Sequence, residues 1–117
     1  LQLADDIALQ IAANYQIIDV FNQIQGYHGE KNYFVENTDV DHAVKQHLIS
    51  YMLKQNVLNR ICLFDENQDF TYVGRAVDYG YLKKIVQIQN ILQTRSLIIQ
   101  NKTEKEACFG SILRIRI

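Results

Sequence analysis

Residues 72–81 bring together the residue types that could bind a small anionic molecule. The stretch contains a single cation, Arg75, together with tyrosines and two glycines. A guanidinium can hold a carboxylate through two parallel hydrogen bonds, and tyrosine rings can wall the ligand. The same stretch could instead be a surface loop whose tyrosines cap the core and whose Arg75 pairs with Asp78. The candidate ligand-binding residues are Tyr72, Arg75, Asp78, Tyr79 and Tyr81.

The remaining polar residues form no catalytic or metal-binding pattern. His42 and His47 are five residues apart, which does not bring two imidazoles to one helix face, and His28 stands alone. The sequence contains no G-x-S-x-G, no P-loop and no G-x-G-x-x-G motif. We therefore expect no catalytic residues, no metal site and no cofactor, and we do not expect this domain to be an enzyme.

The two cysteines, Cys62 and Cys108, match neither a zinc pattern nor a C-x-x-C redox motif. Each lies in an apolar run typical of a strand, which favours two buried structural thiols. A disulfide between them is the alternative. It would require neighbouring strands and an oxidising compartment.

Composition places the chain among ordinary globular domains. The 117 residues are 48% hydrophobic and 21% charged, with a formal net charge of −1, so we expect a single folded domain over residues 1–117. The near-zero charge disfavours nucleic-acid binding. No apolar stretch approaches the roughly 20 residues that span a bilayer. The first residues do not resemble a signal peptide, and the last ones form an apolar run, so we expect the domain to be part of a longer protein.

Two helices are predicted in the first half of the chain. The segment 3–25 has the spacing of one long helix, with Ile7, Ile11, Ile18 and Phe21 on one face. A second apolar face holds Leu9, Ile17, Val20 and Ile24, which predicts partners on two sides, such as the domain itself and a second copy. The segment from Thr38 to about Asn56 predicts another helix, and Thr38 with Asp41 resembles a capping box.

The second half of the chain predicts strands. Residues 59–64 and 70–73 flank a polar turn and predict a β-hairpin. Helical spacing returns between Tyr81 and Leu92, followed by strands at 96–100 and 107–117. In the last strand, Arg114 and Arg116 could face a ligand or an anionic partner, or form the solvated face of an edge strand. The order predicts an α+β fold with helices against a mostly antiparallel sheet.

This order of elements resembles the Cache family, the extracellular PAS-like sensor domains of bacterial membrane receptors. The resemblance rests on the second helix running into residues 57–70, read as Val-Leu-Asn-Arg-Ile-Cys-Leu-Phe-Asp-Glu-Asn-Gln-Asp-Phe, and on a closing strand at 110–117. It implies a PAS-like sheet of four to five strands, a long N-terminal helix and a sensor core over about 38–117. It also implies a ligand pocket between the sheet and residues 72–81.

The functional expectation follows from this resemblance. We expect an extracytoplasmic domain of a cell-membrane receptor, such as a two-component histidine kinase, with flanking membrane helices and a homodimer formed through the N-terminal helix. Such a domain would bind a small molecule or relay a signal through that helix. The alternative is a cytosolic α+β module for dimerisation or interaction, without a small-molecule ligand.

Overall fold

The structure is a computed structural model that describes residues 2–27, 29–54, 58–65, 69–76, 80, 96–101 and 115–116. Four helices come first: α1 (Gln2–Ala12), α2 (Tyr15–Ile24), α3 (Tyr33–Glu36) and α4 (Thr38–Leu53). Four strands follow: β1 (Leu58–Phe64), β2 (Phe70–Gly74), β3 (Ser96–Asn101) and β4 (Ile115–Arg116). The predicted α+β class is confirmed.

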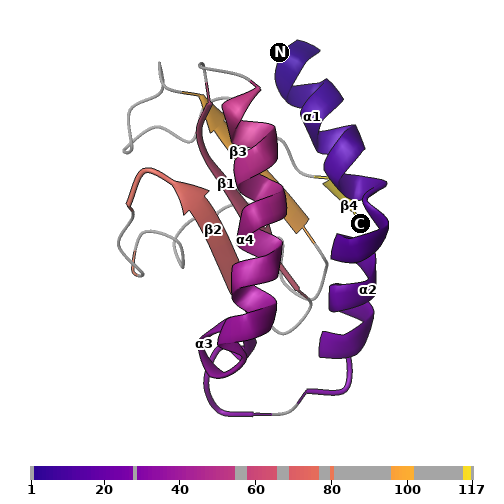
Figure 1. Cartoon of the computed structure of the whole chain (residues 1–117), viewed down its shortest axis with the longest axis vertical. Coiled ribbons are helices and arrows are strands. Elements are labelled where there is room, and N and C mark those ends of the chain that lie inside the picture. The colour runs from indigo at the N-terminus through magenta and orange to yellow at the C-terminus, as the bar shows by residue number, and fades with distance from the viewer. Residues whose placement is uncertain are drawn as a thin grey trace.

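The strands form one antiparallel sheet in the order β2-β1-β3-β4 (Figure 1). The predicted hairpin is confirmed as β1 and β2, whose register runs from Phe64 opposite Phe70 to Arg60 opposite Gly74. The backbone of Arg116 lies in β4, opposite Ser96. The helix predicted over 81–92, and all of the strand predicted over 107–117 except β4, lie outside the described residues.

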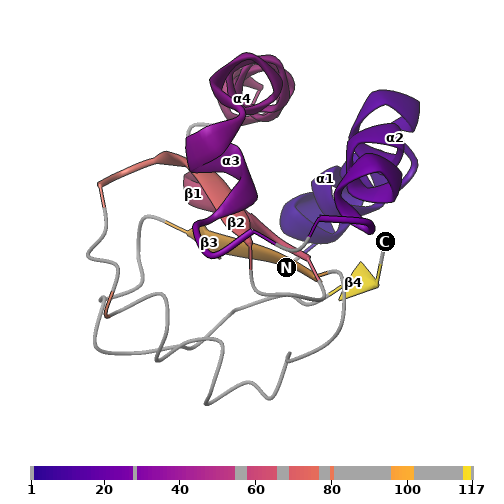
Figure 2. The ribbon, with the colours of Figure 1, turned by 90° about the horizontal axis from the view of Figure 1, so that it is seen from below.

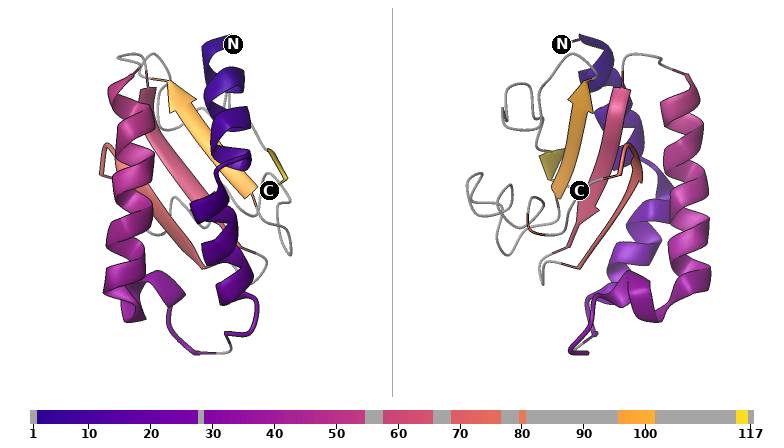
Figure 3. Two further views of the ribbon diagram at one scale, coloured as in Figure 1. Left: turned by 45° about the vertical axis from the view of Figure 1, so that its right-hand side comes forward. Right: turned by 90° about the vertical axis from the view of Figure 1, so that its left-hand side faces the viewer.

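The helices cover one face of this sheet (Figure 2). Helix α4 contacts β2 and β1, whereas α1 contacts β3 and β4. The α1–α2 pair and α4 run side by side in opposite directions (Figure 3). The core lies between the two layers and includes Ile11, Phe21, Leu48, Ile61 and Leu63, all of them almost fully buried. Among the described residues, no helix is long and apolar enough to cross a membrane.

The prediction of one continuous helix over 3–25 is wrong, because α1 ends at Ala12 and α2 begins at Tyr15. Asn14 leaves helical geometry with ψ of 113°, and its side-chain Oδ1 accepts hydrogen bonds from the amides of Gln16 and Ile17. These bonds make Asn14 the N-cap of a new helix. Its Nδ2 also donates to the hydroxyl of Tyr51, 3.1 Å away, which ties the junction between α1 and α2 to α4.

The break also changes which residues face the core. On a straight helix each residue advances about 100°, so Ile17 would lie about 120° around the axis from Ile11. In the broken helix both are fully buried, together with Phe21 and Ile24. Of the second apolar face predicted from the sequence, only Leu9 is strongly exposed, at 61%. The domain's own core therefore takes up most of the surface that the sequence assigned to a second partner.

The second predicted helix is confirmed as α4, but the capping box at its start is wrong. The N-cap residue is Asn37, and Thr38 is already the first helical residue. Asp41 does not cap the helix. Its Oδ1 accepts a hydrogen bond from the hydroxyl of Thr71 in β2, and its Oδ2 lies 3.0 Å from the Nζ of Lys45. Asp41 therefore connects α4 to the sheet, in place of the capping bond expected at the start of the helix.

Candidate functional site

The candidate site lies on the face of the sheet opposite the helices. Successive side chains of a strand point to opposite faces. Ile61 and Leu63 belong to the core beneath the helices, so Arg60, Cys62 and Phe64 point to the other face. All three are buried. This central strand is therefore covered on both sides, and its far side carries a cation.

Each of the three residues has a neighbour directly opposite in β2. The pairs, from one end of the hairpin to the other, are Arg60 with Gly74, Cys62 with Tyr72, and Phe64 with Phe70. Directly opposite residues point to the same face and their side chains interact. The rings of the Phe64–Phe70 pair lie 5.7 Å apart between centroids. The face thus changes from a cationic end to an aromatic end within one hairpin. We call these six residues the Arg60 face.

Arg60 is the most unusual residue of the described chain, because its side chain is fully buried, at 0% exposure. Removing a charge from water costs several kcal/mol unless strong polar partners compensate. The backbone around it is also irregular. The register between β1 and β3 shifts between Leu58 and Arg60, the mark of a β-bulge. Such bulges are over-represented beside functional sites, where they redirect a side chain.

Gly74 shapes the other side of Arg60. Its φ is +104°, and a Cβ atom built there would lie 2.3 Å from the carbonyl oxygen of Asn59 and 2.7 Å from the Cα of Arg60. Only glycine fits such a close approach at positive φ. The next amide, of Arg75, donates to the carbonyl of Asn59 at 2.9 Å. The chain therefore leaves β2 directly beside the backbone of Asn59 and Arg60.

Cys62 lies in the middle of the Arg60 face as a free, buried thiol. The disulfide considered from the sequence is therefore not present. Burial raises the pKa of this thiol to about 12, while the charge of Arg60 lowers it to a smaller extent. A thiol that stays protonated is a poor nucleophile, which fits the expected role of Cys62 as a buried structural thiol.

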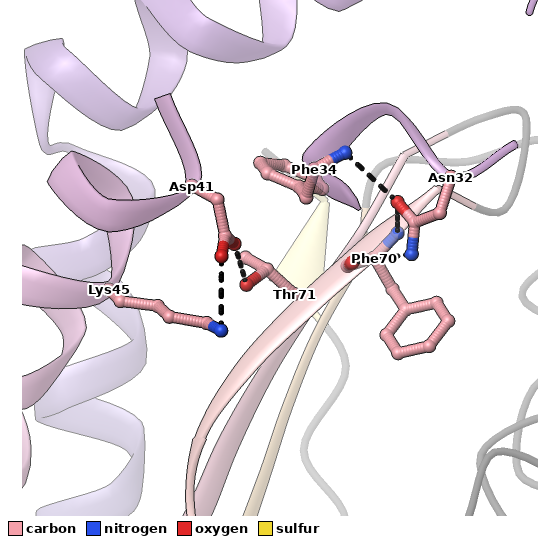
Figure 4. A network of polar contacts seen from close by, with 6 residues as sticks. All are labelled: Asn32, Phe34, Asp41, Lys45, Phe70 and Thr71. Atoms are coloured by element: carbon pink, nitrogen blue, oxygen red, sulfur yellow. Dashed lines mark hydrogen bonds and ion pairs between the residues drawn. The ribbon is translucent and has the colours of Figure 1, made fainter. Parts of the chain in front are cut away.

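The opposite end of the hairpin is fixed by a hydrogen-bond network that reaches the helix layer (Figure 4). Asn32 accepts hydrogen bonds from the amides of Phe34 and Phe70, each at 3.2 Å, and donates to the carbonyl of Phe70 at 2.9 Å. The amide of Tyr33 donates to Oδ1 of Asp69 at 3.0 Å. These bonds hold the start of β2 against α3, so the hairpin cannot tilt freely.

The carboxylate of Asp65 and the backbone of Asp69 close the turn between β1 and β2. Oδ1 of Asp65 accepts from the amide of Asp69 at 2.8 Å, and the Asp65 amide donates to the Asp69 carbonyl at 2.9 Å. Both side chains are buried, with 3% and 7% exposure. The hairpin therefore has negative charge at its turn and positive charge at Arg60.

The structure places the predicted ligand-binding residues in part. Tyr72 is half-buried and lies on the Arg60 face. Arg75 is exposed, one residue beyond Gly74. Asp78, Tyr79 and Tyr81 lie outside the described residues, so the predicted grouping of the five is not seen. The part of the chain that the structure describes contains no group of three His, Cys, Asp or Glu side chains placed to hold a metal ion.

Sequence reasoning missed Arg60 itself. The signal was available, since Arg60 is a charged residue in a mostly apolar strand that also contains Asn59. An isolated charge in such a run indicates either an edge position or a buried charge with a purpose. Comparisons with models of protein families, with curated proteins and with solved structures found no match to this chain.

Proposed function

We propose that this chain is the extracytoplasmic signal-sensing domain of a bacterial transmembrane receptor of the two-component histidine kinase type. In this proposal the domain binds a small anionic ligand on the Arg60 face of a PAS-like sheet. The observation that carries the proposal is the fully buried Arg60 on the sheet face away from the helices. The resemblance to Cache domains supplies the receptor context.

The chemistry of a buried arginine supports an anionic ligand. A guanidinium offers five N–H donors in a fixed fork, so it can serve a contact within the chain and a bound carboxylate together. Stability alone gives little reason to keep a charge here, because well-packed apolar residues often replace buried ion pairs without loss. Tyr72 lies on the same face. The segment with Arg75 starts beside Asn59, the residue before Arg60. Tyr72 and Arg75 can complete a site around the ligand's anionic group.

The packing of β1 supports transmission of the signal to the helices. One face of β1 carries Arg60, and the other carries Ile61 and Leu63, which pack in the core beneath the helices. Because protein cores are close-packed, a displacement of β1 has to be accommodated by its neighbours. The bond between Asn14 and Tyr51 joins α4 to the break between α1 and α2. A ligand that shifts β1 would therefore alter the orientation of α1 within the domain.

Ligand binding is tested first by a thermal-shift screen of the domain against carboxylates, phosphates, amines and sugars. A ligand at about 100 times its Kd adds about 2.7 kcal/mol and raises the midpoint by several degrees. We expect a shift with carboxylates that is lost in Arg60→Met and reduced in Arg75→Ala. Lys45→Met, which removes a cation on α4, is the matched control and should keep the shift. No shift with any class would refute ligand binding.

The receptor assignment is tested separately in cells that express the full-length protein. Gln10 is exposed on α1, so a Gln10→Cys variant offers a reactive thiol to a membrane-impermeant maleimide. Labelling in intact cells is expected for an extracytoplasmic domain, with the parent protein as the control. Labelling only after lysis would contradict this location and favour a cytosolic interaction module.

A further inference from the structure

Aromatic rings and carboxylates come together where α3 contacts β2, away from the Arg60 face (Figure 1). The rings of Tyr27 and Tyr33 lie 5.1 Å apart between centroids and are inclined by 81°. Glu36 is in α3, one turn after Tyr33, and Asp69 accepts a hydrogen bond from the Tyr33 amide. Both tyrosines are only half-buried, so solvent and solutes can reach the rings. We call these four residues the α3 cluster.

The loop before α3 holds the ring of Tyr27 in one position. Its hydroxyl donates a hydrogen bond to the carbonyl of Lys31 at 2.9 Å. A Cβ atom at Gly29 would overlap this hydroxyl group, so the ring lies directly against the glycine backbone. The edge-to-face contact with Tyr33 restrains the ring further. A ligand that contacts these rings therefore requires little ordering of the site.

Asp69 has a carboxylate whose hydrogen bonds are incomplete within the described residues. The residue is only 7% exposed, and the Tyr33 amide bonds to one of its oxygens, Oδ1, at 3.0 Å. In the described parts of the chain, Oδ2 accepts no hydrogen bond and the carboxylate forms no ion pair. A carboxylate removed from water normally requires hydrogen bonds or a cation. A positively charged N–H donor would supply both.

The charge around the two rings is negative. Burial raises the pKa of the Tyr27 hydroxyl, and the carboxylates of Glu36 and Asp69 raise this pKa further. Both carboxylates are therefore close enough to act on the ring. Glu36 is exposed and, within the described residues, has no ion pair of its own. Because the face of an aromatic ring also attracts cations, the rings and the carboxylates favour a ligand of the same charge.

From this arrangement we propose that the α3 cluster binds a small organic ammonium ion. An N–H group of the ligand donates to Oδ2 of Asp69, and its alkyl part lies against Tyr27 and Tyr33. A metal ion would make no use of the rings, and a quaternary ammonium ion has no N–H group to donate. The site is separate from Arg60 and goes beyond the proposed function.

NMR titration of the isotope-labelled domain measures such binding even when the Kd is millimolar. Butan-1-ammonium should shift the amide resonances of Tyr27, Tyr33 and Glu36. Butan-1-ol lacks the charge, ammonium lacks the alkyl part, and N,N,N-trimethylbutan-1-ammonium lacks the N–H group. At equal ionic strength each of these three should bind at least about tenfold more weakly. Equal binding of the alcohol, tighter binding of the trimethyl compound, or no binding of butan-1-ammonium would overturn the inference.

The source of the ammonium group is distinguished by a fifth probe, Nα-acetyl-lysine methylamide, which carries the same butylammonium group on a peptide unit. Weaker binding than butan-1-ammonium is expected for a site that takes a free amine. Tighter binding would keep the ammonium chemistry but assign it to a lysine side chain of a peptide.

Matched variants assign the contacts. Asp69→Asn keeps an acceptor for the Tyr33 amide but removes the charge, and it should weaken butan-1-ammonium binding at least about tenfold. Tyr33→Leu should weaken binding about threefold or more. Asp39→Asn on α4 and Tyr15→Leu on α2 remove the same groups from other exposed positions and should bind like the parent domain.

Glu36→Gln is the second test of the charge, because an exposed residue can be changed without loss of the fold. It should reduce affinity about two- to threefold and serves if Asp69→Asn does not fold. Arg75→Ala, which tests the carboxylate site, should leave amine binding unchanged. If both Asp69→Asn and Glu36→Gln bind butan-1-ammonium like the parent domain, the α3 cluster is not the site and the inference fails, whereas carboxylate binding at Arg60 is unaffected by this result.

Discussion

Replacing Gly74 by alanine should destabilise the domain far more than the same change at Gly26. Gly74 has a φ of +104°, and its added Cβ would lie 2.3 Å from the carbonyl oxygen of Asn59. At Gly26 no atom lies within 4 Å of the added Cβ, and φ is not in the left-handed region. The two substitutions add the same atoms, so the difference between them isolates backbone geometry.

The size of the effect follows from two contributions. A non-glycine residue at such a positive φ costs about 1–3 kcal/mol. The overlap is with backbone rather than with a flexible side chain, so the strand must move and stretch the bond from the Arg75 amide to Asn59. Losing that bond adds about 0.5–1.5 kcal/mol. We expect a total of about 2–4 kcal/mol, whereas Gly26→Ala should be neutral or stabilise by up to about 1 kcal/mol.

Urea unfolding followed by circular dichroism measures both variants. The midpoint for Gly74→Ala should fall without a change in the slope m, because the surface exposed on unfolding stays the same. In a thermal scan, the same loss should lower the midpoint by roughly 10 °C. If Gly74→Ala unfolds within about 0.5 kcal/mol of Gly26→Ala, the close approach of β2 to Asn59 is wrong, and so is the constrained setting inferred for Arg60.

Three further predictions test other parts of the structure. Asn14→Ala should lower the free energy of unfolding by about 1 kcal/mol through loss of the N-cap, and Asn14→Asp should retain most of it in urea titrations. Ile17→Ala should cost about 2–5 kcal/mol because Ile17 is fully buried, whereas Leu9→Ala should change stability by less than about 0.5 kcal/mol. Folding raises the pKa of Cys62 from 9.0 to about 12, so unfolding releases its proton between these values. The stability from this thiol is present below pH 9 and lost as pH rises toward 12. Cys62→Ala should therefore flatten the stability–pH curve in that window.

The fold was predictable where local patterns and tertiary packing agree. The hairpin of β1 and β2 and the helix α4 follow from period and turn residues alone. The break between α1 and α2 could not be predicted in this way, because the segment has no proline or internal glycine to indicate an interruption. Asn14 ends α1 because capping α2 and bonding Tyr51 satisfy its side chain, while the break buries Ile11 and Ile17 together. That advantage comes from tertiary packing, so it leaves no signature in the spacing of apolar residues along the sequence.

The candidate site was predictable only in part for a related reason. The residue types in 72–81 indicated a place for an anion, and Tyr72 does lie on the Arg60 face. Arg60 escaped notice because a strand covered on both sides loses the alternation that normally separates core from surface. Its burial depends on the position of β1 between β2 and β3, and strand order is a property of the whole sheet.

The location of Arg60 on β1 constrains how a ligand could act on the rest of the domain. β1 is hydrogen-bonded on both sides, and the turn end of its hairpin is held to α3 through Asn32. A group on so constrained a strand is preorganised, which favours affinity because little ordering is required on binding. The same constraint keeps any displacement of β1 on ligand binding small. A conformational response must therefore arise where the structure is less tightly connected, and the break at Asn14, joined to α4 by a single side-chain hydrogen bond, is the described position that best meets this requirement.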